Sequence, residues 1–272
     1  MSDTKYQLGF IGAGKLAGSV IRGLVLRNYC TADAIIASEP NPQAREGLAK
    51  ELGIHVTAEN AEVTEKAEII FLGVKPVVVL PVLRELRVAK KLLISFAAGV
   101  RISSMEQVTE ARVMRVMTNT PGAIGRAATA FARGSRTTDD DVANVRALFG
   151  AIGIVVEVSD EQIDGVTALA GSGPAFVYTM IEALAHGGEQ TGLSRDSALR
   201  LAAQTALGAA ELVLTSDKSP EELRRMVVTP GGTTAAGLAT IEKGAASEAI
   251  SAAVEAAAAR GRAMADEFSA PK

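Results

Sequence analysis

The sequence predicts an α/β fold, with a parallel sheet covered by helices in residues 1–160 and an all-helical domain in residues 161–272. Three observations support this prediction. In the first region, short runs rich in β-branched residues alternate with longer amphipathic stretches, which is typical of a parallel sheet covered on both faces. After about residue 160, alanine, leucine and glycine recur at helical spacing, and no further strand is expected. The chain has 272 residues, which exceeds the usual size of a single domain.

Strands and helices alternate in the first region. The expected strands are residues 6–12, 34–38, 67–74, 91–99 and 111–119. The expected helices between them are residues 15–28, 41–53 and 76–86. The first helix buries one face, because its apolar residues recur at helical spacing. The third helix is opened by Pro76, since proline suits the first helical position. Met114 and Met117 alternate along the last strand and are expected in the core.

The second region is expected to contain only helices. They cover residues 161–192, 194–216, 219–228 and 247–268. Ser194 and Ser219 are suited to cap the second and third of these helices, and Gly192 to end the first. This region is apolar on several faces and has few aromatic residues, so we expect it to pack against a second subunit and form at least a dimer.

Charge and cysteine content exclude several classes of function. The formal net charge is −3 and no long basic run is present, which argues against nucleic acid as a partner. Cys30 is the only cysteine and both histidines are isolated from it, so neither a disulfide nor a metal site is expected. The N-terminus lacks the pattern of a secretory signal, which predicts a cytoplasmic protein. The uncharged run over residues 165–181 is too short for a membrane span.

A glycine motif joins the first expected strand to the first expected helix. It reads Gly12-x-Gly14-x-x-Ala17, and alanine is tolerated in the third glycine position of a dinucleotide-binding fingerprint. The glycines permit a tight turn and a close approach of the backbone to a pyrophosphate, which the helix start stabilises. A tight turn without a ligand is disfavoured, because a strand, a helix and an acidic residue occupy the expected places. The first domain is therefore predicted to be Rossmann-like and to bind NADPH or NADH.

The residues after the second expected strand leave the choice of cofactor open. A carboxylate such as Glu39 normally accepts hydrogen bonds from the ribose hydroxyls of NAD and repels a 2′-phosphate. Ser38 beside it is able to donate to a phosphate instead. The loops after the third and fourth strands also lie where open α/β sheets bind ligands. Lys75 in the first of these loops either neutralises cofactor phosphate or is an ordinary solvated lysine.

Six motifs in order along the chain resemble the pyrroline-5-carboxylate reductase family. They are GFIGAGKLAGS, FLGVKP, SFAAGV, RVMTNTPG, TALAGSGPAFVY and VVTPGGTTAAGL, and the match runs from Gly9 to Ala265. The resemblance implies hydride transfer from NADPH or NADH to the cyclic imine of Δ1-pyrroline-5-carboxylate, giving L-proline in the last step of proline biosynthesis. It also implies helical domains that interlock as homodimers, which assemble into a decamer of five dimers.

The resemblance also implies roles for individual residues. The implied cofactor contacts are Ile11, Gly12, Ala13, Gly14, Lys15, Leu16, Ser38, Glu39, Asn60, Gly73, Val74, Lys75, Pro76, Ala97, Ala98 and Gly99. The implied catalytic residues are Thr234, Thr167 and Asp217, and the implied substrate-binding residues are Gly231, Gly232, Thr233 and Asn119. Many relatives that prefer NADPH carry a small polar residue where this chain has Glu39, so the preference for NADPH stays open.

The segment Pro230-Gly231-Gly232-Thr233-Thr234 interrupts the helical region. Pro230 is expected to end the preceding helix, and the glycines let the backbone turn. Thr233 and Thr234 would then start the next helix and present free N–H groups to an anion. No strand precedes this segment, so a small carboxylate is favoured over a phosphate. The carboxylate of pyrroline-5-carboxylate fits this expectation, with its ring facing the nicotinamide and with help from the partner subunit.

Two other functions are weighed against this one. β-Hydroxyacid dehydrogenases also join a Rossmann domain to helices, but they carry a catalytic lysine shortly after a glycine motif. Here the sequence after Pro174 reads AFVYTMIEAL and contains no lysine. A non-catalytic nucleotide sensor would be expected to lose the Pro-Gly-Gly-Thr-Thr segment, which is intact.

Overall fold

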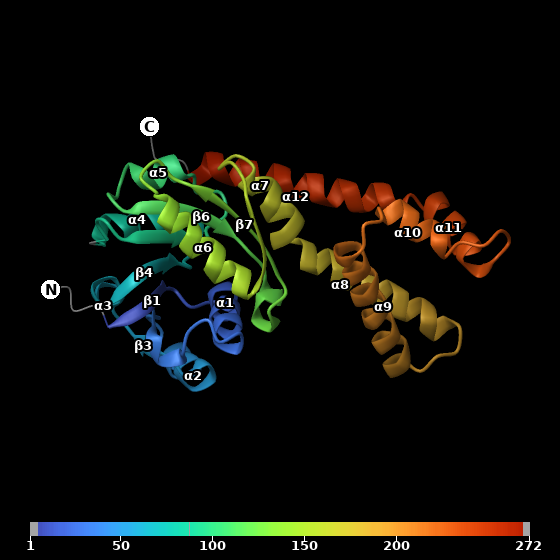
Figure 1. Cartoon of the computed structure of the whole chain (residues 1–272), viewed down its shortest axis with the longest axis horizontal. Coiled ribbons are helices and arrows are strands. Elements are labelled where there is room, and N and C mark those ends of the chain that lie inside the picture. Colours follow the sequence, from blue (N-terminus) through green and yellow to red (C-terminus); the bar gives the residue numbers. More distant parts are fainter. Residues whose placement is uncertain (1–4, 87, 269–272) are drawn as a thin grey trace. The chain divides into compact units, whose positions relative to one another are not determined.

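The computed structural model describes residues 5–86 and 88–268 (Figure 1). The backbone forms two compact units, Met1–Ser172 with Glu255–Lys272 and Gly173–Val254. The last helix, α12 (Ala246–Phe268), begins in the second unit, and its final turns belong to the first. The boundary expected at residue 160 stays a prediction.

The first unit is built on one sheet of eight strands in the order β3-β2-β1-β4-β5-β6-β7-β8. The strands are β1 (Tyr6–Ile11), β2 (Ile35–Ser38), β3 (His55–Thr57), β4 (Ala67–Leu72), β5 (Leu92–Ser95), β6 (Arg112–Met117), β7 (Ala127–Arg133) and β8 (Gly153–Glu157). Neighbouring strands from β3 to β6 are parallel. β7 is antiparallel to β6, and β8 is parallel to β7.

The five strands predicted from the sequence, β1, β2, β4, β5 and β6, are parallel as expected, but β3, β7 and β8 were not predicted, and the chain reverses its direction at β7. Only residues 118–126 separate β6 from β7, and part of that stretch is the short 3-10 helix η2 (Thr120–Ile124). A parallel crossover needs a dozen or more residues, so the chain has to reverse here. The sequence of β7, AATAFAR, is dominated by alanine and lacks the β-branched run that would have indicated a strand.

Helices cover both faces of the sheet, as predicted. One core contains residues of α1 (Lys15–Leu26), α2 (Pro42–Leu52) and α6 (Asp139–Ala151). The other contains residues of α3 (Asn60–Lys66), α4 (Pro76–Glu85), α5 (Ile102–Glu106) and α7 (Ile163–Val166). Phe10 and Phe71 stack in the first core, with ring centroids 4.4 Å apart. Met114 and Met117 are buried, one in each core, which confirms their predicted structural role.

The second unit is helical throughout, as predicted. It contains α8 (Gly173–Gln190), α9 (Arg195–Thr215), α10 (Pro220–Met226), α11 (Thr233–Lys243) and the beginning of α12. The hydroxyl of Ser194 accepts a hydrogen bond from the backbone N–H of Ser197, and Ser219 forms a capping box with Glu222, so both predicted caps are confirmed. Gly192 follows α8 with a φ of +97°, a conformation that suits glycine.

Two predictions for this region need correction. The helix expected over residues 161–192 is divided into α7, a π-helical turn over Thr167–Gly171, and α8. Helix α10 ends at Met226, several residues before Pro230, so the proline does not end it as expected. Residues 227–232, with the sequence VVTPGG, instead form the loop that leads to α11.

Candidate active site

The glycine loop after β1 brings two chain segments into close contact. Gly12 has a φ of +81°, which an L-amino acid with a side chain rarely adopts. A Cβ atom on Gly73 would lie 2.5 Å from the carbonyl oxygen of Gly12, so the loops after β1 and β4 approach each other through these glycines. Gly14 occupies the N-cap position of α1, and no side chain among the described residues caps this helix. A Cβ on Gly14 would meet nothing within 4 Å, which leaves space for an anion at the helix start.

A pocket of about 400 Å³ lies beside this loop. Its lining residues are Gly14, Lys15, Leu16, Ala17, Gly73, Val74, Lys75, Pro76, Phe96, Ala97, Ala98 and Met264. Nine of the residues expected to contact the cofactor are therefore brought together from the loops after β1, β4 and β5. Ile11 and Ala13 are buried next to this pocket's glycine loop, and their side chains pack in the core.

The end of β2 carries the residues expected at the adenine ribose. The Ser38 hydroxyl donates to Oδ1 of Asn60 at 2.6 Å, and Ser38 is buried. Oε1 of Glu39 accepts from the backbone N–H of Asn41 at 3.0 Å, at the start of α2. Arg45 donates to the carbonyl oxygens of Glu39 and Pro40, at 2.9 Å each. These hydrogen bonds hold the segment after β2 in a defined conformation. The carbonyl of Ser38 also accepts a hydrogen bond from the N–H of Gly12, which joins the end of β2 to the glycine loop.

The second candidate region is the start of α11, in the second unit. Gly231 has a φ of +70°, and Gly232 is the extended N-cap residue. Thr233 and Thr234 open the helix, as predicted. No side chain of the described residues caps this start either, so its first N–H groups and the positive end of the helix dipole are available to an anion. Thr234 is half-buried, whereas Thr233 is exposed.

The remaining residues expected to contact substrate lie in different surroundings. Thr167 is half-buried in the π-helical turn after α7, and its hydroxyl donates to the Ile163 carbonyl at 2.8 Å. Asn119 is buried, and its amide group donates to the Ala170 carbonyl and accepts from the Ala128 N–H. Asp217 is almost fully exposed in the loop before α10. The Asn119 side chain therefore connects the end of β6 with the turn that carries Thr167.

Two residues that line the first pocket were not predicted from the sequence. Phe96 lies in the loop after β5 that was expected to line the groove, and it could have been included with its neighbours. Met264 comes from α12, at the other end of the chain, and no local pattern indicated its position. The close approach depends on Gly99, which has a φ of +73° and whose Cβ would lie 2.8 Å from Cβ of Met264.

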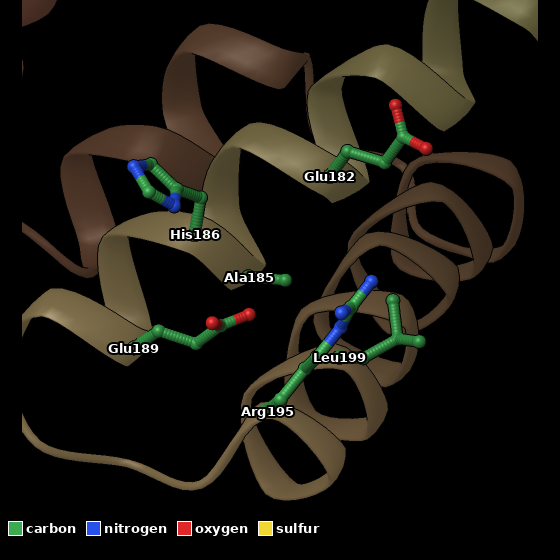
Figure 2. A pocket seen from close by; sticks show the side chains of 6 residues that line it. All are labelled: Glu182, Ala185, His186, Glu189, Arg195 and Leu199. Carbon is green, nitrogen blue, oxygen red and sulfur yellow. The ribbon is translucent and has the colours of Figure 1, made fainter.

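A further pocket lies within the second unit, between α8 and α9 (Figure 2). It has a volume of about 410 Å³ and is lined by Glu182, Ala185, His186, Glu189, Arg195 and Leu199. Figure 2 shows the two glutamates and His186 along α8, with Arg195 and Leu199 on the facing helix. Apart from Ala185 and Leu199 the lining is polar, and none of the residues expected in the active site belongs to it.

The described residues offer neither a cluster of metal ligands nor an activated thiol. Within residues 5–86 and 88–268, no three His, Cys, Asp or Glu residues are grouped so that they could hold a metal ion. Burial raises the pKa of the Cys30 thiol, which disfavours the reactive thiolate. Among the described helices, none is both long and apolar enough to cross a bilayer.

Two family descriptions match the chain. "Pyrroline-5-carboxylate reductase dimerisation" matches residues 160–264, and "NADP oxidoreductase coenzyme F420-dependent" matches residues 7–99. The first covers the helical region, where large apolar side chains are exposed on several helices, among them Tyr178, Leu184, Leu207 and Leu214. Where exposed apolar side chains form one contiguous patch, they often mark a site of contact with another protein or a ligand.

Similar proteins and structures cover almost the whole chain. Pyrroline-5-carboxylate reductase of Pisum sativum is 41% identical over 96% of this chain and 97% of the relative. The enzyme of Arabidopsis thaliana is 40% identical over 94% and 95%. The Plasmodium falciparum pyrroline carboxylate reductase structure with NADP bound has a TM-score of 0.87 and 30% identity, covering 96% of this chain and 99% of that one. The Coxiella burnetii structure has a TM-score of 0.85 and 31% identity, covering 98% and 100%. The chain therefore belongs to the pyrroline-5-carboxylate reductase family.

Proposed function

We propose that this protein reduces the cyclic imine of Δ1-pyrroline-5-carboxylate to L-proline, the last step of proline biosynthesis, with NADPH or NADH as the reductant. The observation that carries the proposal is the start of α11, where Gly231 and Gly232 open a helix that no described side chain caps. A small carboxylate is the anion that this site fits, because its N–H groups and helix dipole favour negative charge. Relatives about 40% identical over nearly their whole length have the same activity in their names.

The residues proposed to hold the substrate act mainly by orientation. A protonated imine is already electrophilic, so the site needs to place it, exclude water and manage one proton. Gly231, Gly232 and Thr233 would hold the carboxylate through the backbone at the start of α11. The Thr234 hydroxyl would hydrogen-bond the ring nitrogen and hold its proton, since a hydroxyl both donates and accepts. Thr167, Asp217 and Asn119 complete the proposed set of substrate residues.

The first pocket fits a dinucleotide. The open space at Gly14, the left-handed Gly12 and the uncapped start of α1 together suit a pyrophosphate, which the backbone there would hold. When bound, the reduced nicotinamide supplies the hydride that the imine carbon accepts. Lys75, the N-cap residue of α4, lines this pocket and would offset phosphate charge. The proposed adenine-ribose contacts are Ser38, Glu39 and Asn60, and they leave the choice between NADPH and NADH to experiment.

We also propose that the enzyme is a cytoplasmic homodimer built through its helical domain, and that five dimers assemble into a decamer. The exposed apolar side chains of the second unit support the dimer, because a soluble monomer rarely leaves so many uncovered. Light scattering coupled to size-exclusion chromatography distinguishes a monomer, a dimer and a decamer by mass.

The activity is tested by following the nicotinamide absorbance with pyrroline-5-carboxylate and each cofactor in turn. Oxidation of NADPH or NADH that depends on substrate supports the proposal, and the ratio of kcat/KM values gives the cofactor preference. A β-hydroxy acid with NAD⁺ or NADP⁺ is the control for the dehydrogenase alternative. If neither reduced cofactor is oxidised by enzyme that binds NADPH, the proposed reaction is wrong.

A further inference from the structure

Four charged residues form a cluster inside the first unit, and the residues proposed above do not include any of them. Arg115 and Asp164 are each 1% exposed, while Arg101 and Asp160 lie at the edge of the cluster with side chains 23% and 18% exposed. Arg101 binds Asp164 at 2.6 Å, and Arg115 binds Asp160 at 2.6 Å and Asp164 at 3.3 Å. Two positive and two negative charges therefore compensate one another away from water. We call these four residues the charge cluster.

The charge cluster joins three separate segments of the chain. Arg101 is the N-cap residue of α5 and follows directly on the loop after β5. Arg115 lies on β6, opposite Ser95 at the end of β5. Asp160 precedes α7, and its carboxylate accepts from the N–H of Ile102 at 3.1 Å while its carbonyl accepts from both arginines. The first turn of α5, the centre of β6 and the chain entering α7 are thus tied together at one point.

Stability alone gives a weak reason for such a cluster. The cost of removing charges from water offsets much of their attraction, and well-packed apolar residues often serve as well. The geometry is also imperfect, because Nε of Arg115 is buried and has no hydrogen-bond partner among the described residues. A buried donor left in this state lowers the stability of the fold. The hydrogen bonds of the two arginines are directional, and apolar side chains could not replace them in this respect. They fix the three segments in one position relative to one another.

Both of the outer segments lead to proposed active-site residues. Asp164 is in α7, which continues directly into the π-helical turn that begins with Thr167. Arg101 lies two residues after Gly99, at the end of the loop in which Ala97 and Ala98 line the dinucleotide pocket. The side chain of Arg101 therefore links the wall of the pocket to α7, the helix that leads into the turn with Thr167.

We propose that the charge cluster is a positioning device, in which Arg101 and Arg115 hold the Thr167 turn in register with the pocket loop over Phe96–Gly99. The substrate contact of Thr167 belongs to the proposed function, and this inference rests on it to that extent. None of the four residues lines the dinucleotide pocket or belongs to the proposed substrate residues, so they are positioning residues. Loss of the Arg101 guanidinium group, which bonds both Asp160 and Asp164, would leave the pocket loop and the Thr167 turn folded but would let one shift against the other.

Arg101→Gln tests this role, with Arg101→Lys as the conservative variant and Arg136→Gln as the matched control. Arg136 also anchors the end of α5, by donating to the carbonyls of Glu106, Thr109 and Ala111, and among the described residues it makes no hydrogen bond to α7. We expect Arg101→Gln to lower kcat about tenfold or more, while the dissociation constant for NADPH changes less than about threefold, because the glycine loop is untouched. Arg101→Lys should recover part of the loss, since it keeps the charge but not the fork. Equal kcat values for Arg101→Gln and Arg136→Gln would overturn the proposal.

Amide hydrogen exchange separates this inference from the proposed function, because it needs no substrate. Arg101→Gln should accelerate exchange over residues 163–171 by about tenfold, and Arg136→Gln should leave it unchanged. Unchanged exchange in Arg101→Gln would overturn the positioning role, whatever the activity. If the parent enzyme fails to reduce pyrroline-5-carboxylate but the exchange result holds, the reaction is wrong and the cluster still positions the turn.

Discussion

The starts of α10 and α11 both belong to the second unit and are built in opposite ways. Before α10, the Ser219 hydroxyl accepts from the N–H of Glu222 at 3.2 Å, and the Glu222 carboxylate accepts from the N–H of Ser219 at 2.8 Å. Before α11, Gly232 provides no side chain, and none of the described residues supplies one in its place. Side chains of α10 therefore cap its own start, whereas the first N–H groups of α11 have no side-chain cap among the described residues and are those proposed to hold the substrate carboxylate.

The same contrast recurs in the first unit. Asn41 caps α2 and Thr138 caps α6, but α1 starts after Gly14 without a cap. A glycine at this position costs a helix only a few tenths of a kcal/mol relative to serine, so stability hardly opposes it. The two helix starts proposed to hold an anion thus share a glycine N-cap beside a left-handed glycine, which leaves room for an anion at the first N–H groups.

The largest effect is expected from removal of the Thr234 hydroxyl at the start of α11. Thr234→Ala should lower kcat by more than about tenfold, because the proposed partner of the substrate nitrogen is lost. Affinity for NADPH should stay nearly unchanged. Thr240→Ala is the control, since Thr240 is an exposed threonine of the same helix whose hydroxyl bonds the Ala236 carbonyl. Unchanged turnover in Thr234→Ala would remove Thr234 from the proposed mechanism.

A smaller effect is expected from the backbone of the same loop. Gly231→Ala places a side chain at a φ of +70°, where an L-residue costs about 1–2 kcal/mol, although nothing lies within 4 Å of the new Cβ. The loop should therefore relax away from its present shape, and KM for pyrroline-5-carboxylate should rise several-fold. Gly237→Ala in α11 is an equally open site with helical backbone and should leave KM unchanged. Equal KM values for the two variants would show that the left-handed turn is not needed for substrate binding.

The capped start should behave in the opposite manner. Ser219→Ala removes the hydroxyl that caps α10 and should lower the free energy of unfolding by about 1 kcal/mol. It should leave kcat and both KM values unchanged, because α10 contributes no proposed substrate residue. Urea denaturation followed by circular dichroism, together with the absorbance assay, measures both quantities. A loss of activity without a loss of stability would show that the start of α10 serves catalysis and is not only a structural cap.

The smallest effect concerns acid sensitivity at the same cap. The backbone N–H and then the hydroxyl of Ser219 hold the pKa of Glu222 below its ordinary value. A carboxylate with a lowered pKa contributes stability that is present above its unfolded pKa of about 4.3 and is lost as pH falls through the folded value. Glu222→Gln should therefore flatten part of the fall in stability below about pH 4.3. The neighbouring Glu221→Gln is the control, and identical acid profiles for the two variants would contradict the role of the cap.

Local signals in the sequence were sufficient for much of the fold and for the loops of the site. The strand, glycine loop and helix around Gly12 follow from three short-range patterns, and the caps at Ser194 and Ser219 depend only on adjacent residues. The reversal between β6 and β7 was missed because alanine gives little indication of strand or helix. Met264 and the charge cluster could not be predicted, since each depends on segments that are distant in sequence. Asp160 and Asp164 looked like ordinary acidic residues until Arg101 and Arg115 were placed beside them.

The contact between Gly99 and Met264 makes the dinucleotide pocket dependent on segments far apart in the sequence. The glycine loop and the loops after β4 and β5 all lie before residue 100, whereas Met264 in the pocket lining belongs to α12. A change in α12 is therefore able to alter the pocket although every residue of the glycine motif stays intact.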